Sequence, residues 1–92
     1  MDSDTAVREI DEAVHKHVGG EDEGFRAACE AALSEVESVA GGDAVDDLTR
    51  FIDGYVREHE ERPQIVEVDE RAAEIVREHG ESLPPDSYLQ NV

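Results

Sequence analysis

Residues 24–42 read GFRAACEAALSEVESVAGG, and this stretch decides the fold because its apolar residues recur at helical spacing up to a double glycine. These residues lie on one face of a helix; they are Phe25, Ala28, Cys29, Ala32, Leu33, Val36 and Val39. Gly41 and Gly42 are typical of a helix C-terminus, since they lack a β-carbon. The stretch predicts a helix over 24–40.

The same spacing on both sides predicts three further helices, over 4–18, 44–61 and 63–79. Their apolar stripes are Val7, Ile10, Val14, His17 and Val18; Val45, Leu48, Ile52, Tyr55, Val56 and His59; and Ile65, Val68, Ala72, Ile75, Val76 and His79. Asp43 is expected to cap the third helix, and Pro63 suits the first turn of the fourth. Gly80 should close the fourth helix.

A short strand over 64–68 is the alternative to the start of the fourth helix, because Ile65-Val66-Glu67-Val68 is rich in β-branched residues. A lone strand would have no pairing partner in a chain that otherwise lacks strand alternation. We therefore expect a helix there. After Gly80, Leu83-Pro84-Pro85 forces an extended course, and Tyr88 and Leu89 either fold back onto the core or stay disordered.

The predicted fold is therefore all-α, a small bundle of about four amphipathic helices (4–18, 24–40, 44–61 and 63–79) with an extended C-terminal tail. Residues 1–79 should form a single helical domain, and 80–92 a proline-containing tail. A chain of 92 residues can bury only a modest core.

Acidic residues dominate the surface that such a bundle must expose. The chain has 25 acidic and 8 basic residues, which gives a formal net charge of -17. Self-repulsion of this size opposes folding at low salt, whereas molar salt shortens the Debye length to about 3 Å. The composition resembles that of proteins from extreme halophiles that accumulate salt internally. The alternative is a basic partner or mimicry of nucleic acid, but the acids are spread along the chain rather than gathered in one block.

The sequence also predicts in which compartment the protein is located. It has no run of about 20 apolar residues to cross a membrane, and its first residues lack the features of a secretory signal. We expect a cytoplasmic protein with no membrane partner. Cys29 has no second cysteine for an internal disulfide, which fits a reducing compartment.

Histidines are the first candidates for chemistry, but His17, His59 and His79 each fall in the last turn of a predicted helix. An imidazolium there is stabilised by the negative end of the helix dipole. His17 and His59 could approach each other, yet a zinc site needs three or four converging ligands and no CxxC, HxxxH or HExxH spacing supplies them. We predict no metal site.

No catalytic residue and no cofactor-binding motif stands out. Carboxylates are so abundant that pairs of them do not indicate acid–base catalysis. Both glycine pairs follow a helix, whereas phosphate-binding loops lead from a strand into one. Cys29 lies on the apolar stripe and is expected to be a buried small side chain rather than a nucleophile. We expect no enzymatic activity and no cofactor.

One stretch resembles a known family. Residues 48–63, LTRFIDGYVREHEERP, are similar to the opening helix and turn of the N-terminal winged-helix domain of LexA-type repressors. The resemblance implies a third helix that reads DNA and a β-wing after it. Here the chain instead runs straight from Val68 through to His79, so that neither a separate recognition helix nor a wing is evident.

The function expected from these observations is a non-enzymatic helical protein-interaction domain that binds another protein or a second copy of itself. Four small residues of the second helix allow close approach by another helix; they are Ala27, Ala28, Ala31 and Ala32. Alternatively, these four alanines serve ordinary helix packing within the chain. The alternative function is a helix-turn-helix-like DNA-associated regulator built on 44–79. Its candidate DNA contacts are Arg62, Arg71 and Arg77, although nucleic acid is the less favoured partner because acids outnumber bases there.

The net charge leads to the first testable prediction. Helical circular dichroism and thermal stability should rise with potassium chloride up to the molar range, because screening removes the self-repulsion of the carboxylates. A protein that is already folded and equally heat-stable at about 50 mM salt would contradict the halophilic interpretation.

Overall fold

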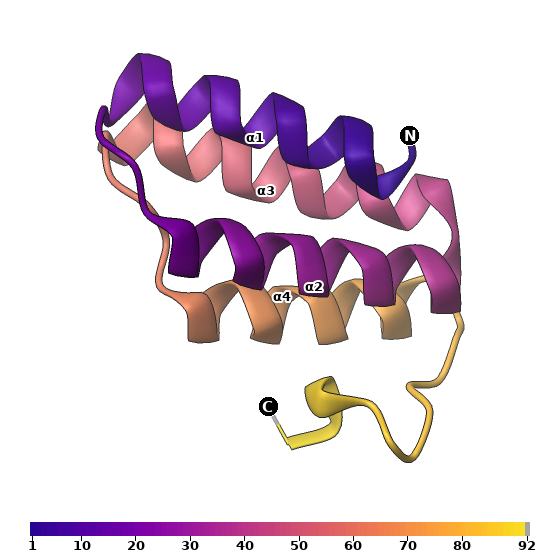
Figure 1. Ribbon diagram of the computed structural model, residues 1–92. Helices are drawn as coiled ribbons and strands as arrows, with labels where there is room; N and C mark the ends of the chain where they lie inside the picture. Colours follow the sequence, from indigo (N-terminus) through magenta and orange to yellow (C-terminus); the bar gives the residue numbers. More distant parts are fainter. Residues whose placement is uncertain (92) are drawn as a thin grey trace.

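The computed structural model describes residues 1–91, which are all-helical apart from their connections (Figure 1). The four α-helices are α1 (Ser3–His17), α2 (Glu23–Ala40), α3 (Gly42–His59) and α4 (Ile65–Glu78), followed by a short 3-10 helix, η1 (Tyr88–Asn91). The predicted all-α fold is confirmed, with every helix boundary within two residues of its expected place. Residues 65–68 belong to α4, so the strand alternative is wrong.

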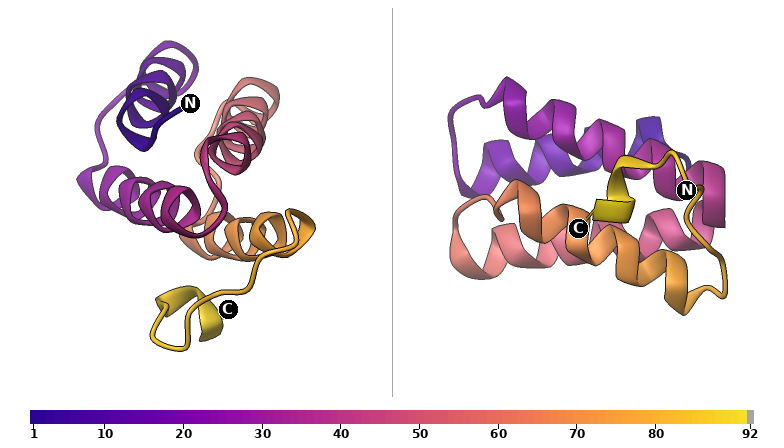
Figure 2. Two further views of the ribbon diagram at one scale, coloured as in Figure 1. Left: turned by 90° about the vertical axis from the view of Figure 1, so that its right-hand side faces the viewer. Right: turned by 90° about the horizontal axis from the view of Figure 1, so that it is seen from below.

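The helices stand at the corners of a square, with α1 beside α3 and α2 beside α4 (Figure 2). Successive helices run in opposite directions, so the neighbours α1 and α3 point the same way, as do α2 and α4 (Figure 1). The short α2–α3 connection crosses the diagonal of the square (Figure 2). Each half of the chain therefore packs chiefly against the other half.

The core is a single cluster of buried side chains from all four α-helices and from η1. Most members are Ala and Val, and the largest fully buried side chains include Leu33, Leu48 and Ile52. Burial of apolar surface is the main stabilising term in folding. The predicted stripes supply most of this core, but Ile65 at the start of α4, described below, and His59 in the last turn of α3 are exposed.

The junction between α2 and α3 depends on both glycines. Gly41 has φ +87° and is at once the last cap of α2 and the first cap of α3, a conformation that favours glycine. A β-carbon on Gly42 would lie 3.1 Å from the carbonyl oxygen of Met1. A side chain at position 42 would therefore force the N-terminal backbone to shift slightly away from α3.

Two details of the predicted helix starts are wrong. Asp43 does not cap α3, because that helix already begins at Gly42 and Asp43 lies inside its first turn. Pro63 does not open α4 either: Gln64 is still extended, with ψ 148°, and α4 begins at Ile65. Glu60 ends α3 in a left-handed conformation with φ 53°, and the Pro63 ring is buried in the connection that follows.

Two other aspartates do cap helices. The Asp22 Oδ1 accepts a hydrogen bond from the Phe25 backbone N–H at 2.9 Å, at the start of α2. At the start of α1, the Asp2 Oδ1 accepts one from the Thr5 N–H at 2.8 Å. Both satisfy amides that have no partner within the helix.

The second prediction follows from these caps. Asp22→Ala should lower the free energy of unfolding by about 1 kcal/mol, because it removes a side-chain cap. The control, Asp43→Ala, should cost clearly less at about 2 M potassium chloride, where the interaction of its charge with the helix dipole is screened. Urea unfolding of both variants measures the difference. Equal losses would show that Asp43, rather than Gly41, defines the start of α3.

Candidate interaction surfaces

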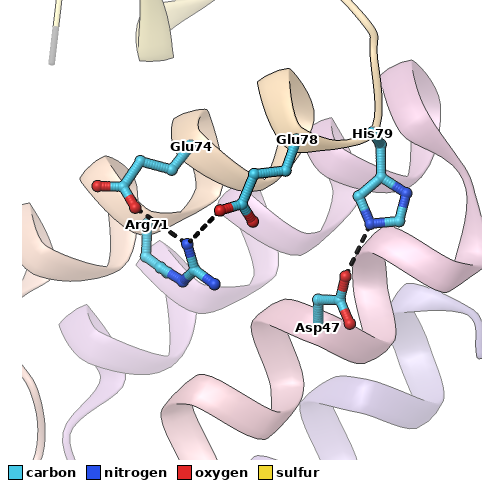
Figure 3. Close-up of polar contacts among 5 residues, drawn as sticks. All are labelled: Asp47, Arg71, Glu74, Glu78 and His79. Atoms are coloured by element: carbon cyan, nitrogen blue, oxygen red, sulfur yellow. Dashed lines mark hydrogen bonds and ion pairs between the residues drawn. The ribbon is translucent and has the colours of Figure 1, made fainter.

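Two of the four histidines, His79 and His59, take part in contacts between and along helices. The His79 Nε2 and the Asp47 Oδ2 lie 2.7 Å apart, which joins the end of α4 to the first half of α3 (Figure 3). The His59 ring packs on Tyr55, with 4.4 Å between ring centroids. Within residues 1–91, no three His, Cys, Asp or Glu side chains are grouped so that they could hold a metal ion.

Cys29 lies in the core with 1% of its surface exposed, as its place on the apolar stripe predicts. Burial, together with smaller effects of the carboxylates of Asp11 and Asp69, raises the pKa of its thiol to about 12. The reactive thiolate is therefore strongly disfavoured in the folded state.

Of the three arginines considered for DNA contact, Arg71 and Arg62 already have partners within the chain. Arg71 on α4 is 2.9 Å from Glu74 and 3.2 Å from Glu78 (Figure 3). Arg62, in the α3–α4 connection, donates a hydrogen bond from Nη2 to the Gly19 carbonyl at 3.2 Å. Arg77 is exposed on α4. A phosphate would have to compete with two carboxylates for Arg71.

Two hollows lie along α1 and α2. The first, of about 270 Å³, is at the α1–α2 loop; it is lined by both acids and bases and includes the pair Arg26–Asp11. The second, of about 390 Å³, is a groove between the two helices. Its lining is Ser3, Asp4, Val7, Ala27, Glu30, Ala31 and Ser34.

The alanines of α2 divide between two faces. Ala32 is fully buried and Ala28 is half-buried, so this pair serves packing within the chain. Ala27 and Ala31 are exposed and line the α1–α2 groove. Half of the series is therefore left free by the packing of the four helices.

The exposed first turn of α4 is the clearest departure from the predicted core. Ile65 was expected on the buried stripe, but 46% of its surface is exposed, and its neighbour Val66 is 52% exposed. The reason is the late start of α4: Ile65 is the first helical residue, and the buried stripe begins only with Val68. We call this pair the Ile65–Val66 edge.

Asp53 on α3 is a titratable group that the sequence pattern did not single out. Its Oδ1 is buried and has no hydrogen-bond partner among residues 1–91. Burial raises the pKa of Asp53 to about 6; the Glu9 carboxylate also raises it, and Arg57 lowers it. Asp53 lines neither hollow, so its shift reflects helix packing rather than a substrate-sized site. Its spacing from Thr49 and Val56, both buried, was the available signal.

The third prediction concerns Asp53 and pH. Its raised pKa means that the folded state holds the proton more tightly, so stability is lost as pH rises from about 4 to about 6. Asp53→Asn should therefore stabilise the protein at pH 7 by about 1 kcal/mol, after allowance for solvent screening of a half-exposed side chain.

Urea midpoints of both proteins, measured across this pH range at constant salt, test the difference. When the measurement is extended to acid, the two curves should converge below about pH 3, where the carboxyl of Asp53 is largely neutral in both folded and unfolded chains. A gap that stays constant with pH would rule out ionisation of Asp53 as its cause.

The geometry defines a class, a small four-helix bundle in which α1 and α3, and likewise α2 and α4, are parallel neighbours, with a C-terminal segment packed on α4. No family model, no curated protein and no solved structure matches the chain. None of the helices in residues 1–91 combines the length and apolar character that crossing a membrane requires.

Proposed function

We propose that this chain is a non-enzymatic protein-interaction domain of a salt-rich cytoplasm, and that it binds its partner through the Ile65–Val66 edge. The supporting observation is the exposure of these two neighbouring β-branched side chains, at 46% and 52%. Single exposed apolar residues are ordinary, whereas adjacent ones suggest a contact surface. Burial of both against a partner would remove apolar surface from water.

The charge supports the salt-rich setting. Eight basic residues cannot neutralise 25 acidic ones, and the ion pairs join side chains that all remain at least partly exposed, such as Arg26 and Asp11. Exposed pairs contribute little to stability. Apolar contact at the Ile65–Val66 edge does not depend on charge, and salts that are excluded from protein surfaces strengthen such burial.

The DNA-associated regulator on residues 44–79 has weaker support. Arg71 is held by two carboxylates and Arg62 by a loop carbonyl. The phosphate contacts that give most affinity for DNA also lose their advantage at high salt.

The fourth prediction tests the Ile65–Val66 edge. The double variant Ile65→Ser, Val66→Ser should lose a partner that the unaltered protein retains at about 2 M potassium chloride. Analytical ultracentrifugation detects a second copy of the chain as the partner, and affinity purification from the native cytoplasm detects another polypeptide. We expect affinity to fall at least about tenfold, because two apolar contacts are truncated.

The matched control is Ala27→Ser, Ala31→Ser, which changes two exposed residues in the α1–α2 groove and should leave binding intact. Loss of the partner only in the control would move the proposal to that groove. A reproducible DNA motif selected from random duplexes, and abolished by Arg71→Ala or Arg77→Ala, would replace the interaction domain by the DNA-associated regulator.

A further inference from the structure

The C-terminal segment, residues 81–90, is attached to the bundle by apolar contact. Leu89 is fully buried and belongs to the same core cluster as Cys29 and Leu33. Leu83 is partly buried against that cluster. Among the described elements, η1 packs against α4 (Figure 2). Leu89 is therefore the main anchor of the segment.

The hydrogen bonds of this segment close on the segment itself. The Ser87 N–H donates to the Pro84 carbonyl, and the Gln90 N–H donates to the Ser87 carbonyl. The Gln90 side chain donates to the carbonyls of Leu83 and Pro84 at 2.8 and 3.2 Å. Within residues 1–90, no hydrogen bond or ion pair joins 82–90 to the four α-helices. Residues 82–90 can therefore leave the bundle without breaking such bonds, and rotation at Gly80 additionally breaks only the bond from the Glu81 amide to the Val76 carbonyl.

The point of attachment at the end of α4 is suited to a hinge. Gly80 has φ +78°, a conformation that glycine adopts at little cost and can leave easily. The last polar links to α4 are the bonds from the Gly80 and Glu81 amides to the carbonyls of Arg77 and Val76. Beyond them, the segment is held by Leu89 and Leu83.

We propose that residues 81–90 form a C-terminal latch that swings about Gly80 as a unit, and that its release uncovers the face of the bundle that contains Cys29. The latch opens while the four α-helices stay folded. Local opening of this kind is expected where few buried contacts hold a segment.

The position of η1 connects the latch to Cys29. In both views of Figure 2, η1 lies on the face of the bundle that α2 and α4 form, and Cys29 belongs to α2. Burial is the main cause that raises the pKa of Tyr88 to about 12, as expected for a ring held against the bundle. Cys29 is the only thiol of the chain, which makes it a natural reporter of release.

Thiol labelling of the full chain with Ellman's reagent at about 2 M potassium chloride tests the latch. Labelling of the unaltered protein should be faster than global unfolding allows and should depend little on low urea concentrations, because a small surface is exposed. Leu89→Ala should accelerate labelling roughly 50-fold, since three buried carbon atoms are removed. Its helical circular dichroism should be unchanged.

Leu48→Ala is the matched control, because Leu48 is equally buried but lies on α3, away from η1. It should lower the global urea midpoint more than Leu89→Ala does, without raising labelling in the absence of urea to the same extent. Labelling that follows global unfolding in all three proteins would overturn the latch, because the segment would then be an inseparable part of the core.

Limited digestion with chymotrypsin detects release of the C-terminal latch independently of the Cys29 thiol. Clipping at Tyr88 or Leu89, with the four α-helices left intact and with faster clipping in Leu89→Ala, is the expected result. Absence of such clipping from the native protein would overturn the latch. Clipping without faster thiol labelling would overturn the claim that release uncovers Cys29.

Discussion

The structure depends on one constraint: four narrow apolar stripes must meet while the other faces of the same helices carry carboxylates. The stripes are built largely from Ala and Val, so each buried residue contributes little area and nearly every helical turn has to contribute one. The acids stay outside because a buried, unpaired carboxylate is costly. Asp53 and Asp69 are exceptions, and the pKa of each, raised by burial, is the local sign of that cost.

The arrangement of basic residues follows from the same constraint. Arg71 lies between two acids on α4, and Arg26 bridges to Asp11 on α1. Arg62 instead reaches a loop carbonyl and ties the α3–α4 connection to the α1–α2 connection. These contacts position surface segments locally, while the excess negative charge remains in solvent, where its effect depends on salt.

The helices were predictable because periodic apolar residues and glycine pairs are local signals. The residues that cap the helices were harder to predict. Asp22 and Asp43 both lie at the start of a helix, but only the path of the preceding connection decides which side chain reaches a free backbone amide. Ile65 continued the stripe in sequence but lies ahead of the buried part of α4. The sequence left open whether Leu89 packs on the core, because that contact depends on the path of an irregular segment of chain.

The pairing of α1 with α3 and of α2 with α4 affects how the chain can fold. A hairpin of α1 and α2 alone would leave both stripes half covered, and so would a hairpin of α3 and α4. Neither half of the sequence can then serve as an autonomous folding unit, so the bundle should assemble cooperatively, in one step. During synthesis, the first two helices must wait for the last two before their apolar faces are fully enclosed.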